Sequence, residues 1–339
     1  MSRLTFAEAI VGAIAYEMRR DPDVFLIGQD IGPFGGAMQG TRGLYEEFGA
    51  RRVRDAPISE SAMVGAAIGA ALQGKRPIVE VAFGEFLPCA MSQIVLQAAN
   101  LRYMTADEAR VPVTIRTRVG DGPYRGHPQS YEAWFTHVPG LKVVMPASPA
   151  DAWGVMAAAI RDDEPVLVFE QMYLYHAMRD EVPDGDHLVP IGPARVARPG
   201  RDVTVVATAW MVHRAIEAAA ALAKEGVEVE VIDLRTLAPW DQEMVLASVR
   251  KTGRLVVAHE AWKVGGVGAE VAATVAERSF DALRAPIARV GAPPVPVPSA
   301  TALRNLTIPS AKDIRRAILR VCAAIPHPQT PSPSRGEGA

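Results

Sequence analysis

The chain has 339 residues, of which 49% are hydrophobic, and its formal net charge at pH 7 is −2. This length predicts two domains with sizeable cores, and the near-neutral charge excludes the basic footprint of a nucleic-acid-binding protein. Only two cysteines occur, Cys89 and Cys322, which excludes a disulfide framework or a cysteine-based metal site and favours the cytoplasm.

Helical and strand patterns alternate through the first half of the chain. Thr5 and Glu8 form a capping-box pattern that begins a helix ending near Arg20. The N-terminus lacks a signal-peptide core, and the apolar runs are too short to span a bilayer. The next expected elements are strand 24–27, a Gly-rich loop at 29–43, helix 61–72, strand 77–82, helix 87–103, strand 111–117, strand 141–145, helix 149–161 and strand 165–169. Apolar strands that alternate with helices indicate a parallel sheet covered on both faces.

Recurring prolines break this pattern between Asp180 and Asp202, and we interpret the break as an inter-domain linker. The alternation then resumes with strand 203–207, helix 212–224, strand 228–232, helix 241–251, strand 254–258, helix 268–278, strand 287–290 and helix 311–324. The expected organisation is a first domain at 1–185, a linker at 186–202, a smaller second domain of the same class at 203–325, and a disordered tail rich in Pro, Ser and Gly at 326–339.

The segment 56–60, Ala-Pro-Ile-Ser-Glu, places a carboxylate at the start of a helix made largely of alanine and glycine. The hydroxyl of Ser59 is expected to cap this helix. Glu60 then lies in the first turn, where the helix dipole favours a negative charge. Such an acid is either a surface cap or a buried acid directed at a ligand, and the segment alone favours the cap.

Two glycine-rich motifs have both a functional and a structural interpretation. Gly120-Asp121-Gly122 is the motif that begins a diphosphate–Mg²⁺ site in thiamine enzymes, but that site also needs a later asparagine among its oxygen ligands. Residues 145–151 contain no asparagine, so a plain turn is favoured. The run 265–268, Gly-Gly-Val-Gly, precedes a helix and could cradle a phosphate, but it lacks the dinucleotide spacing, so a tight loop is expected.

His127 lies in a polar loop that follows an expected strand. Loop histidines are mostly solvated, yet parallel sheets gather ligands at the carboxyl ends of their strands, so His127 is a candidate catalytic residue. His259 ends a strand of the second domain, and we expect it to serve packing or an interface. The acids 162–164 lie in a helix-to-strand turn, where solvated side chains are expected.

Several of these stretches together resemble one family, and the resemblance runs from about residue 4 to residue 324. The stretches are Arg42–Leu44, Ala56–Glu60, Leu101–Met104, Glu132–Phe135, His137–Val144, Val231–Leu237, Lys251–Leu255 and His259–Ala261. They resemble the β subunit of the E1 component of 2-oxo acid dehydrogenase complexes, nearest the pyruvate and acetoin types.

This resemblance implies an α/β fold with two doubly wound domains. The first would be a thiamine-diphosphate pyrimidine-binding domain and the second a transketolase C-terminal-type domain. The resemblance also implies an α2β2 heterotetramer in which an E1 α subunit shares the thiamine diphosphate and holds Mg²⁺ through its own Gly-Asp-Gly site. That division agrees with the interpretation of residues 120–122 as a turn.

Glu60 matches the activating glutamate of the family. There, a carboxylate bonded to N1′ of the aminopyrimidine promotes the tautomer whose 4′-imino nitrogen removes the C2 proton of thiamine. The resulting carbanion attacks a 2-oxo group. Ile58 and Phe86 match positions that pack around the pyrimidine.

His127 matches the histidine of the family's Gln-His-Ser-Gln loop, which is implicated in reductive acylation of the lipoyl arm. Gly126 stands here in place of an amide side chain. Pro128 stands in place of serine, which removes a hydroxyl and a backbone donor. These two changes leave the orientation of His127 open.

The resemblance also bears on ions and partners. Some relatives hold a potassium ion at positions that match Val113, Ala159, Ile160, Asp162 and Glu164. In relatives the second domain forms the subunit interface and docks the E2 lipoyl acyltransferase, so E2 is an expected partner. The segment 291–307 departs from the usual pattern, because Ala-Pro-Pro at 292–294 stands where acidic residues are frequent.

The implied activity is oxidative decarboxylation of a 2-oxo acid, with pyruvate as the first choice, followed by acyl transfer to lipoamide. Acetoin cleavage is the close alternative, because it uses the same carbanion. From another class, the chain could be a catalytically silent E1-like assembly subunit; Glu60 argues against that function, while Pro128 leaves it open. A single-chain transketolase is less favoured, because a diphosphate domain is missing.

Overall fold

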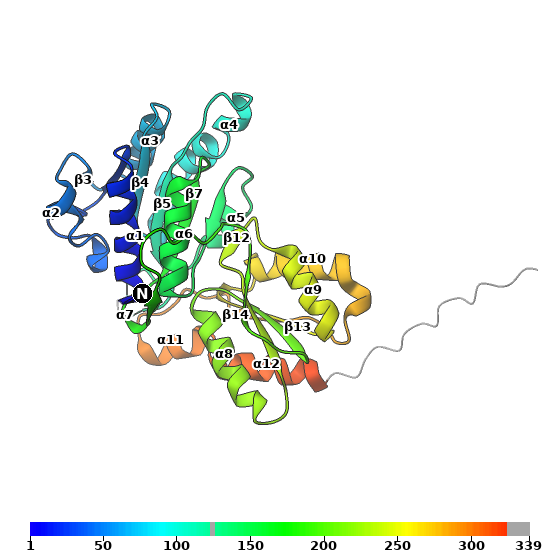
Figure 1. The fold of residues 1–339 in the computed structure, drawn as a ribbon. Helices are drawn as coiled ribbons and strands as arrows, with labels where there is room; N and C mark the ends of the chain where they lie inside the picture. The colour runs from blue at the N-terminus through cyan, green and yellow to red at the C-terminus, as the bar shows by residue number, and fades with distance from the viewer. Residues whose placement is uncertain (123–125, 324–339) are drawn as a thin grey trace, which may run out of the picture.

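A computed structural model describes residues 1–122 and 126–323 of the chain. The described residues form two large sheets with helices packed against them, one built mainly from the first half of the chain and one from the second, together with a small two-stranded sheet (Figure 1). The tail expected at 326–339 lies outside the described residues. Among the described residues, no helix is long and apolar enough to cross a membrane.

The first sheet has seven strands in the order β12-β6-β7-β5-β4-β2-β3. Its neighbouring strands are parallel, except that β12 runs antiparallel to β6. The strands are β2 (Val24–Gly28), β3 (Val53–Asp55), β4 (Arg76–Phe83), β5 (Thr114–Val119), β6 (Lys142–Val144), β7 (Val166–Gln171) and β12 (Thr236–Ala238). Every residue of β5 and β7 is buried, as a sheet covered on both faces requires.

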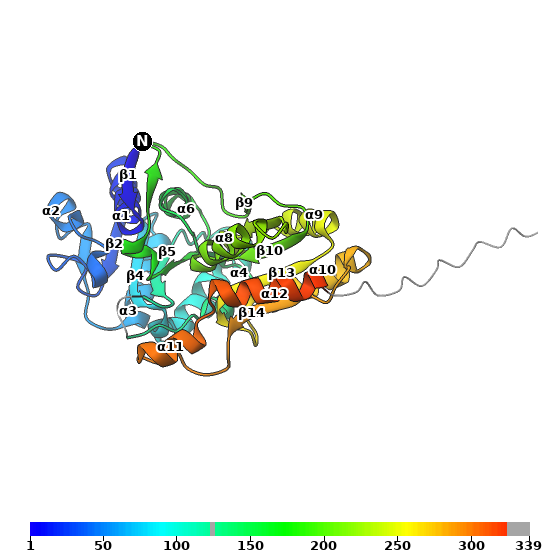
Figure 2. The ribbon, with the colours of Figure 1, turned by 90° about the horizontal axis from the view of Figure 1, so that it is seen from below.

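Helices cover both faces of this sheet. Helices α1 (Phe6–Arg20) and α6 (Pro149–Arg161) pack on each other on one side, and α3 (Glu60–Ala71) lies on the other (Figure 2). The capping box predicted for α1 is confirmed, because the Thr5 hydroxyl accepts the Glu8 amide hydrogen at 3.1 Å and the Glu8 carboxylate accepts that of Thr5 at 2.7 Å. The expected bounds of α6 are confirmed as well.

The single helix expected at 87–103 is wrong. The chain forms a 3₁₀-helix η2 (Gly84–Ala90), a π-helical segment η3 (Ser92–Ala98) and a short helix α4 (Leu101–Met104) instead. Pro88 lies inside η2 and has no amide hydrogen for a helical bond. The Asn100 side chain donates to the carbonyl of Val95 at 3.0 Å and so competes with the backbone ladder.

The second sheet has the order β14-β13-β10-β11-β9 and is parallel except for β9. Helices α8 and α12 pack on one face, and α9 and α10 pack on the other (Figure 1). The elements are β9 (Arg195–Arg198), β10 (Val203–Ala207), α8 (Trp210–Ala223), β11 (Val229–Asp233), α9 (Gln242–Thr252), β13 (Leu255–Trp262), α10 (Val267–Ser279), β14 (Ala288–Ala292) and α12 (Ala311–Ala323).

Short elements escaped the sequence analysis, because fewer than two turns of helix or a few extended residues show no periodicity. They are β1 (Ser2–Thr5), η1 (Ala37–Gln39), α2 (Leu44–Phe48), α5 (Glu132–Thr136), α7 (Leu174–Ala177), β8 (Arg179–Val182), η4 (Phe280–Ala282) and α11 (Thr301–Thr307), together with β3, β9 and β12. Strands β1 and β8 form a separate antiparallel pair.

The two halves of the chain are joined by more than one segment. Strand β12 comes from the second half but extends the first sheet, and β9 lies inside the expected linker but extends the second sheet. Helix α11 reaches back to the first half, where Arg304 donates to the carboxylate of Asp121 at 2.5 Å. The boundaries at 185 and 203 stay a prediction, and these crossings join the two regions firmly.

Candidate active site

The parallel strands β3, β4 and β5 place three of the predicted site residues along one edge of the first sheet. Their carboxyl ends lie at Asp55, Phe83 and Val119. Glu60 follows β3, Phe86 follows β4 and His127 follows β5. Because the carboxyl ends of parallel strands meet at the same edge, this is the edge at which such sheets gather ligands.

Glu60 is the first residue of α3, as the sequence predicts. Its side chain is partly exposed, and it makes no hydrogen bond or ion pair to any residue in the described part of the chain. The expected cap is wrong: Ser59 has φ −160° and ψ 80°, and its hydroxyl bonds no amide of the first turn. The Ser59 carbonyl still serves α3, because it accepts the Met63 amide hydrogen at 3.0 Å.

Ile58 precedes this helix and is 73% exposed. The exposed Ile58 side chain and the nearby Glu60 carboxylate, which accepts no hydrogen bond from the described residues, can therefore both contact a ligand. Helix α3 also packs against η2, the segment that carries Phe86. The structure therefore places Glu60 at the start of α3, Ile58 two residues before it, and Phe86 on the neighbouring η2.

The structure brings Phe86 and His127 into direct contact. The ring centroids of His127 and Phe86 are 4.7 Å apart, and those of His127 and Phe83 are 5.1 Å apart. The His127 side chain is 35% exposed, and its backbone has φ 52°. This left-handed conformation is uncommon outside glycine and marks a position that neighbouring contacts must hold.

A carboxylate that the sequence analysis did not single out anchors this histidine. Glu85 Oε2 lies 3.1 Å from His127 Nδ1, and Glu85 Oε1 accepts the Gln129 amide hydrogen at 3.1 Å. The one sequence signal was its place, directly after a buried strand and next to Phe86. An acid at the carboxyl end of a parallel strand is the kind of residue that this edge uses.

The Gly120-Asp121-Gly122 turn contacts the second half of the chain. The Asp121 amide donates to the Glu260 carboxylate, and the Asp121 carboxylate accepts from Arg304. Gln171 donates to both the Asp121 carbonyl, at 2.8 Å, and Glu260, at 2.9 Å. Burial raises the pKa of Glu260 to about 8, against the two donors that favour its charged form. These contacts fix one end of the loop that carries His127.

Two more buried titratable groups lie in this region. Burial raises the pKa of Glu132 to about 7, and its Oε2 has no hydrogen-bond partner among the described residues. Burial lowers the pKa of His259 to about 4. A Cβ atom on Gly266 or Gly268 would lie 2.8 Å from the His259 ring, so the glycine run at 265–268 makes room for this side chain.

The five positions expected to hold potassium present oxygens that already have partners. The Ile160 carbonyl accepts from Arg76 at 2.9 Å, and the Asp162 carboxylate accepts from Lys142 at 2.7 Å. Glu164 forms an ion pair with Arg102. The carbonyls of Val113 and Ala159 accept from backbone amides at 3.0 and 3.3 Å. The cationic side chains at Ile160, Asp162 and Glu164 oppose a further cation there, so the residues present fit potassium poorly. The acids of this turn are ion-paired and not merely solvated.

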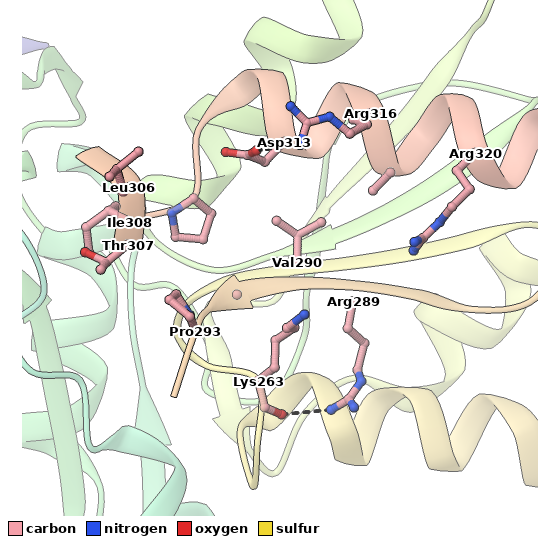
Figure 3. A pocket seen from close by; sticks show the side chains of 13 residues that line it. Lys263, Arg289, Val290, Pro293, Leu306, Thr307, Ile308, Asp313, Arg316 and Arg320 are labelled. Carbon is pink, nitrogen blue, oxygen red and sulfur yellow. Dashed lines mark hydrogen bonds and ion pairs between the residues drawn. The ribbon is translucent and has the colours of Figure 1, made fainter. Parts of the chain in front are cut away.

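Two clefts lie away from the predicted site residues. A cleft of about 370 Å³ in the second half has apolar and cationic walls contributed by β14, α11 and α12, including Arg289, Arg316 and Arg320 (Figure 3). A second cleft, of about 650 Å³, lies along α1. Neither is lined by Glu60, Phe86 or His127. The described residues contain no group of three or more His, Cys, Asp or Glu that could hold a metal ion.

Comparison with known proteins agrees with this two-part organisation. Residues 2–177 match the transketolase pyrimidine-binding domain, and residues 192–314 match the transketolase C-terminal domain. A solved structure titled split gene transketolase, inactive β4 tetramer, superposes with a TM-score of 0.79 at 25% identity, covering 95% of this chain and 99% of that one.

Curated relatives are more similar in sequence. The chain is 46% identical to the β subunit of acetoin:2,6-dichlorophenolindophenol oxidoreductase of Cupriavidus necator, over 93% of this chain and 96% of that protein. It is 43% identical to the β subunit of 2-oxoisovalerate dehydrogenase of Bacillus subtilis, over 87% and 91%. It is also 43% identical to the β subunit of the pyruvate dehydrogenase E1 component of Rhizobium meliloti, over 95% and 70%.

Proposed function

Because this chain belongs to the family of E1 β subunits of 2-oxo acid dehydrogenases, with transketolase-type pyrimidine-binding and C-terminal domains, we propose that it works with an α subunit as a thiamine-diphosphate-dependent E1 enzyme. The reaction would be oxidative decarboxylation of a 2-oxo acid, with pyruvate as the first choice, and transfer of the acyl group to lipoamide.

One observation carries this proposal. Glu60 lies at the start of α3, on the carboxyl edge of the sheet, with a carboxylate that no other described residue engages. The β-subunit relative from Cupriavidus necator aligns with 93% of this chain. An acid with an unengaged carboxylate at this position is suited to accept a hydrogen bond from a protonated ring nitrogen of a ligand. The exposed Ile58 and the Phe86 ring offer apolar surface for the same ring.

Each residue would have a distinct task. Thiamine diphosphate, when bound, supplies the nucleophilic carbon. Glu60 would hold a proton between its carboxylate and the pyrimidine nitrogen N1′, while Ile58 and Phe86 orient the ring and exclude water from it. His127, packed on Phe83 and Phe86, would exchange a proton with the groups that react during acyl transfer.

The partners belong to the proposal as well. The solved relative is titled an inactive β4 tetramer, and we propose by analogy that this chain alone is inactive and becomes active in an α2β2 heterotetramer. The α subunit would hold Mg²⁺ and the diphosphate, and an E2 lipoyl acyltransferase would accept the acyl group. We do not extend the proposal to potassium, because Arg76, Lys142 and Arg102 engage oxygens at the expected site. A cytoplasmic location rests on cysteine usage.

Acetoin cleavage is the second candidate reaction. The acetoin oxidoreductase β subunit is 46% identical to this chain over 96% of its own length, against 43% for the pyruvate and 2-oxoisovalerate relatives. Both reactions need the same carbanion, so the proposed role of Glu60 is common to them. Turnover of pyruvate and acetoin by the α/β pair separates the two.

The test is Glu60→Gln in the reconstituted α/β pair. Gln has nearly the same shape but cannot hold the N1′ proton, so we expect turnover with an artificial electron acceptor to fall by about 10²-fold or more while the pair still assembles. Glu46→Gln, on the exposed side of α2, is the matched control and should retain wild-type turnover. Undiminished turnover by Glu60→Gln would remove Glu60 from the mechanism. An assembled wild-type pair without turnover would favour the silent assembly subunit.

A further inference from the structure

A single carboxylate holds the His127 loop on both sides of Pro128. Glu85 contacts the ring of the residue before Pro128 through one oxygen and the amide of the residue after it through the other, each at 3.1 Å. Pro128 itself has no amide hydrogen to donate. Glu85 therefore supplies attachments at the point where the loop sequence removes one.

The loop needs such an attachment. His127 adopts φ 52°, which a non-glycine residue rarely keeps without tertiary contacts. The rings of Phe83 and Phe86 pack against the imidazole, but these ring contacts do not distinguish one nitrogen of the imidazole from the other. The Gln129 side chain, which accepts from the Val297 amide at 3.2 Å, attaches the far end of the loop to the second half of the chain.

The contact with Glu85 does distinguish the two nitrogens. An ionised carboxylate can only accept a hydrogen bond, so Nδ1 must carry the proton in this contact. In the neutral ring, Nε2 then holds the lone pair. A hydroxyl or an amide side chain in place of Glu85 could either donate or accept and would leave the tautomer unspecified.

We propose that Glu85 is a positioning residue that fixes the ring plane of His127 and keeps its proton on Nδ1, so that protons are exchanged with the reacting groups through Nε2. This inference rests on the proposed function for its place in the reaction. The contact geometry itself stands on Glu85, His127 and Gln129 alone. Glu85 does not need to touch substrate or cofactor.

The first test reads the imidazole directly, in the full chain labelled with ¹⁵N in its seven histidine rings. The His127 resonances are identified by their loss in His127→Gln. In the wild type we expect Nδ1 to be protonated and Nε2 to be bare, and in Glu85→Ala we expect a mixture of tautomers. Glu46→Ala is the control and should leave the spectrum unchanged. A bare Nδ1 in the wild type, or the same tautomer in Glu85→Ala, would overturn the inference.

The second test uses the α/β pair and compares acyl transfer to a lipoyl domain with decarboxylation read by an artificial electron acceptor. We expect Glu85→Ala to lower acyl transfer by about 10- to 100-fold, the range that loss of an orienting partner typically costs, and to lower decarboxylation less. The double variant Glu85→Ala/His127→Ala should be no slower than His127→Ala, because the two residues act as one unit. Glu85→Asp should recover part of the loss.

The outcomes separate this inference from the proposed function. If the losses of the two single variants multiply in the double variant, or if Glu85→Ala transfers acyl groups as fast as the wild type, Glu85 does not position His127. Neither outcome bears on the proposed function, which Glu60→Gln tests separately. If the wild-type pair turns over neither a 2-oxo acid nor acetoin, the proposed function fails. The nitrogen spectrum of the full chain then still decides whether Glu85 sets the state of His127.

Discussion

Two groups of buried carboxylates differ in how their charge is compensated. In the first group, Glu80 and Glu170 flank Arg116 within the first sheet. In the second, Glu132 and Glu260 lie where the first sheet meets the second half of the chain, without an arginine or lysine contact among the described residues. All four carboxylates are at most 6% exposed. What separates the two groups is the charge of their neighbours.

The first group is neutralised within the sheet. Arg116 donates to Glu170 at 2.6 and 2.8 Å and to Glu80 at 2.6 Å, and Arg118 donates to Glu80 at 3.0 Å. Burial by itself raises the pKa of Glu80, but the guanidinium groups of Arg118 and Arg116 outweigh it and hold this pKa below its ordinary value. Glu80 therefore keeps its charge to a lower pH than an ordinary glutamate does.

The hydrogen-bond donors around Glu260 in the second group are neutral, whereas those around the first group include charged guanidinium groups. The Asp121 amide and the Gln171 side chain donate to Glu260, and burial still raises its pKa to about 8. Hydrogen bonds from neutral donors therefore compensate burial only in part, whereas a guanidinium compensates it fully. The first group is a rigid scaffold under the site, and the second makes the contact between the two halves sensitive to pH.

The largest effect should come from removing the cation of the first group. Arg116→Met leaves Glu170 buried without its arginine partner and leaves Glu80 with Arg118 alone, so we expect the free energy of unfolding to fall by about 3–5 kcal/mol. Denaturant unfolding of the purified chain measures it. Arg315→Met, which breaks an exposed pair with Glu225, should cost less than about 1 kcal/mol. Similar costs for the two variants would erase the distinction between the groups.

A smaller effect should follow titration of the second group. Folded Glu260 keeps a proton up to about pH 8, whereas the unfolded chain releases it near pH 4.5. The folded state therefore binds the extra proton, and the free energy of unfolding falls as pH rises between these values, by at most about 1.4 kcal/mol per unit for one group. Glu260→Gln should flatten this dependence, measured as unfolding midpoints from pH 5 to 8.

The matched control for that series is Glu217→Gln, which changes an exposed acid on α8 and should leave the slope as in the wild type. Glu132, with its pKa of about 7, contributes a slope of the same sign, so the double variant Glu132→Gln/Glu260→Gln should be flatter still. His259, whose pKa burial lowers to about 4, contributes a slope of the opposite sign up to about pH 6.5, so the assignment is read from the difference between the wild type and the double variant. A double variant whose midpoints follow the same pH dependence as the wild type would contradict the assignment of these two acids.

The smallest effect concerns the positions expected to bind potassium, which resemble the first group. Arg76, Lys142 and Arg102 already supply positive charge to oxygens there. We therefore expect exchange of KCl for an equal concentration of NaCl or choline chloride to leave the unfolding midpoint unchanged. Potassium at a concentration of about 100 times its Kd would add about 2.7 kcal/mol to the free energy of unfolding. A rise of the unfolding midpoint in KCl alone would therefore reveal a potassium site.

Long elements and their order could be predicted from local pattern. The capping box of α1, the bounds of α6 and the strand–helix alternation follow from residues that are close in the chain. The division of residues 87–103 into short helical segments could not be predicted, because Pro88 and Asn100 interrupt the backbone hydrogen bonds there. Of the site residues, Glu60 lies where the sequence placed it, at the start of α3, but the Ser59 cap is absent.

The contact between Glu85 and His127 joins residues 42 positions apart, and the Arg116 group depends on the register of three strands. In that register Glu80 on β4 stands directly opposite Arg116, and Glu170 on β7 stands opposite Arg118, two residues further along β5. No local pattern carries this information, because a shift of one residue would turn each side chain to the other face of the sheet.

The sequence by itself determined the family, the two α/β domains and the place of an acid at a helix start, because periodicity, caps and long matching strings are local properties of a chain. The tertiary structure alone decided which carboxylates are charged, which one holds His127, and how β9, β12 and α11 join the two halves. The reason is that burial and charge neutralisation depend on neighbours brought together by folding, and the energy of a buried charge is set by those neighbours.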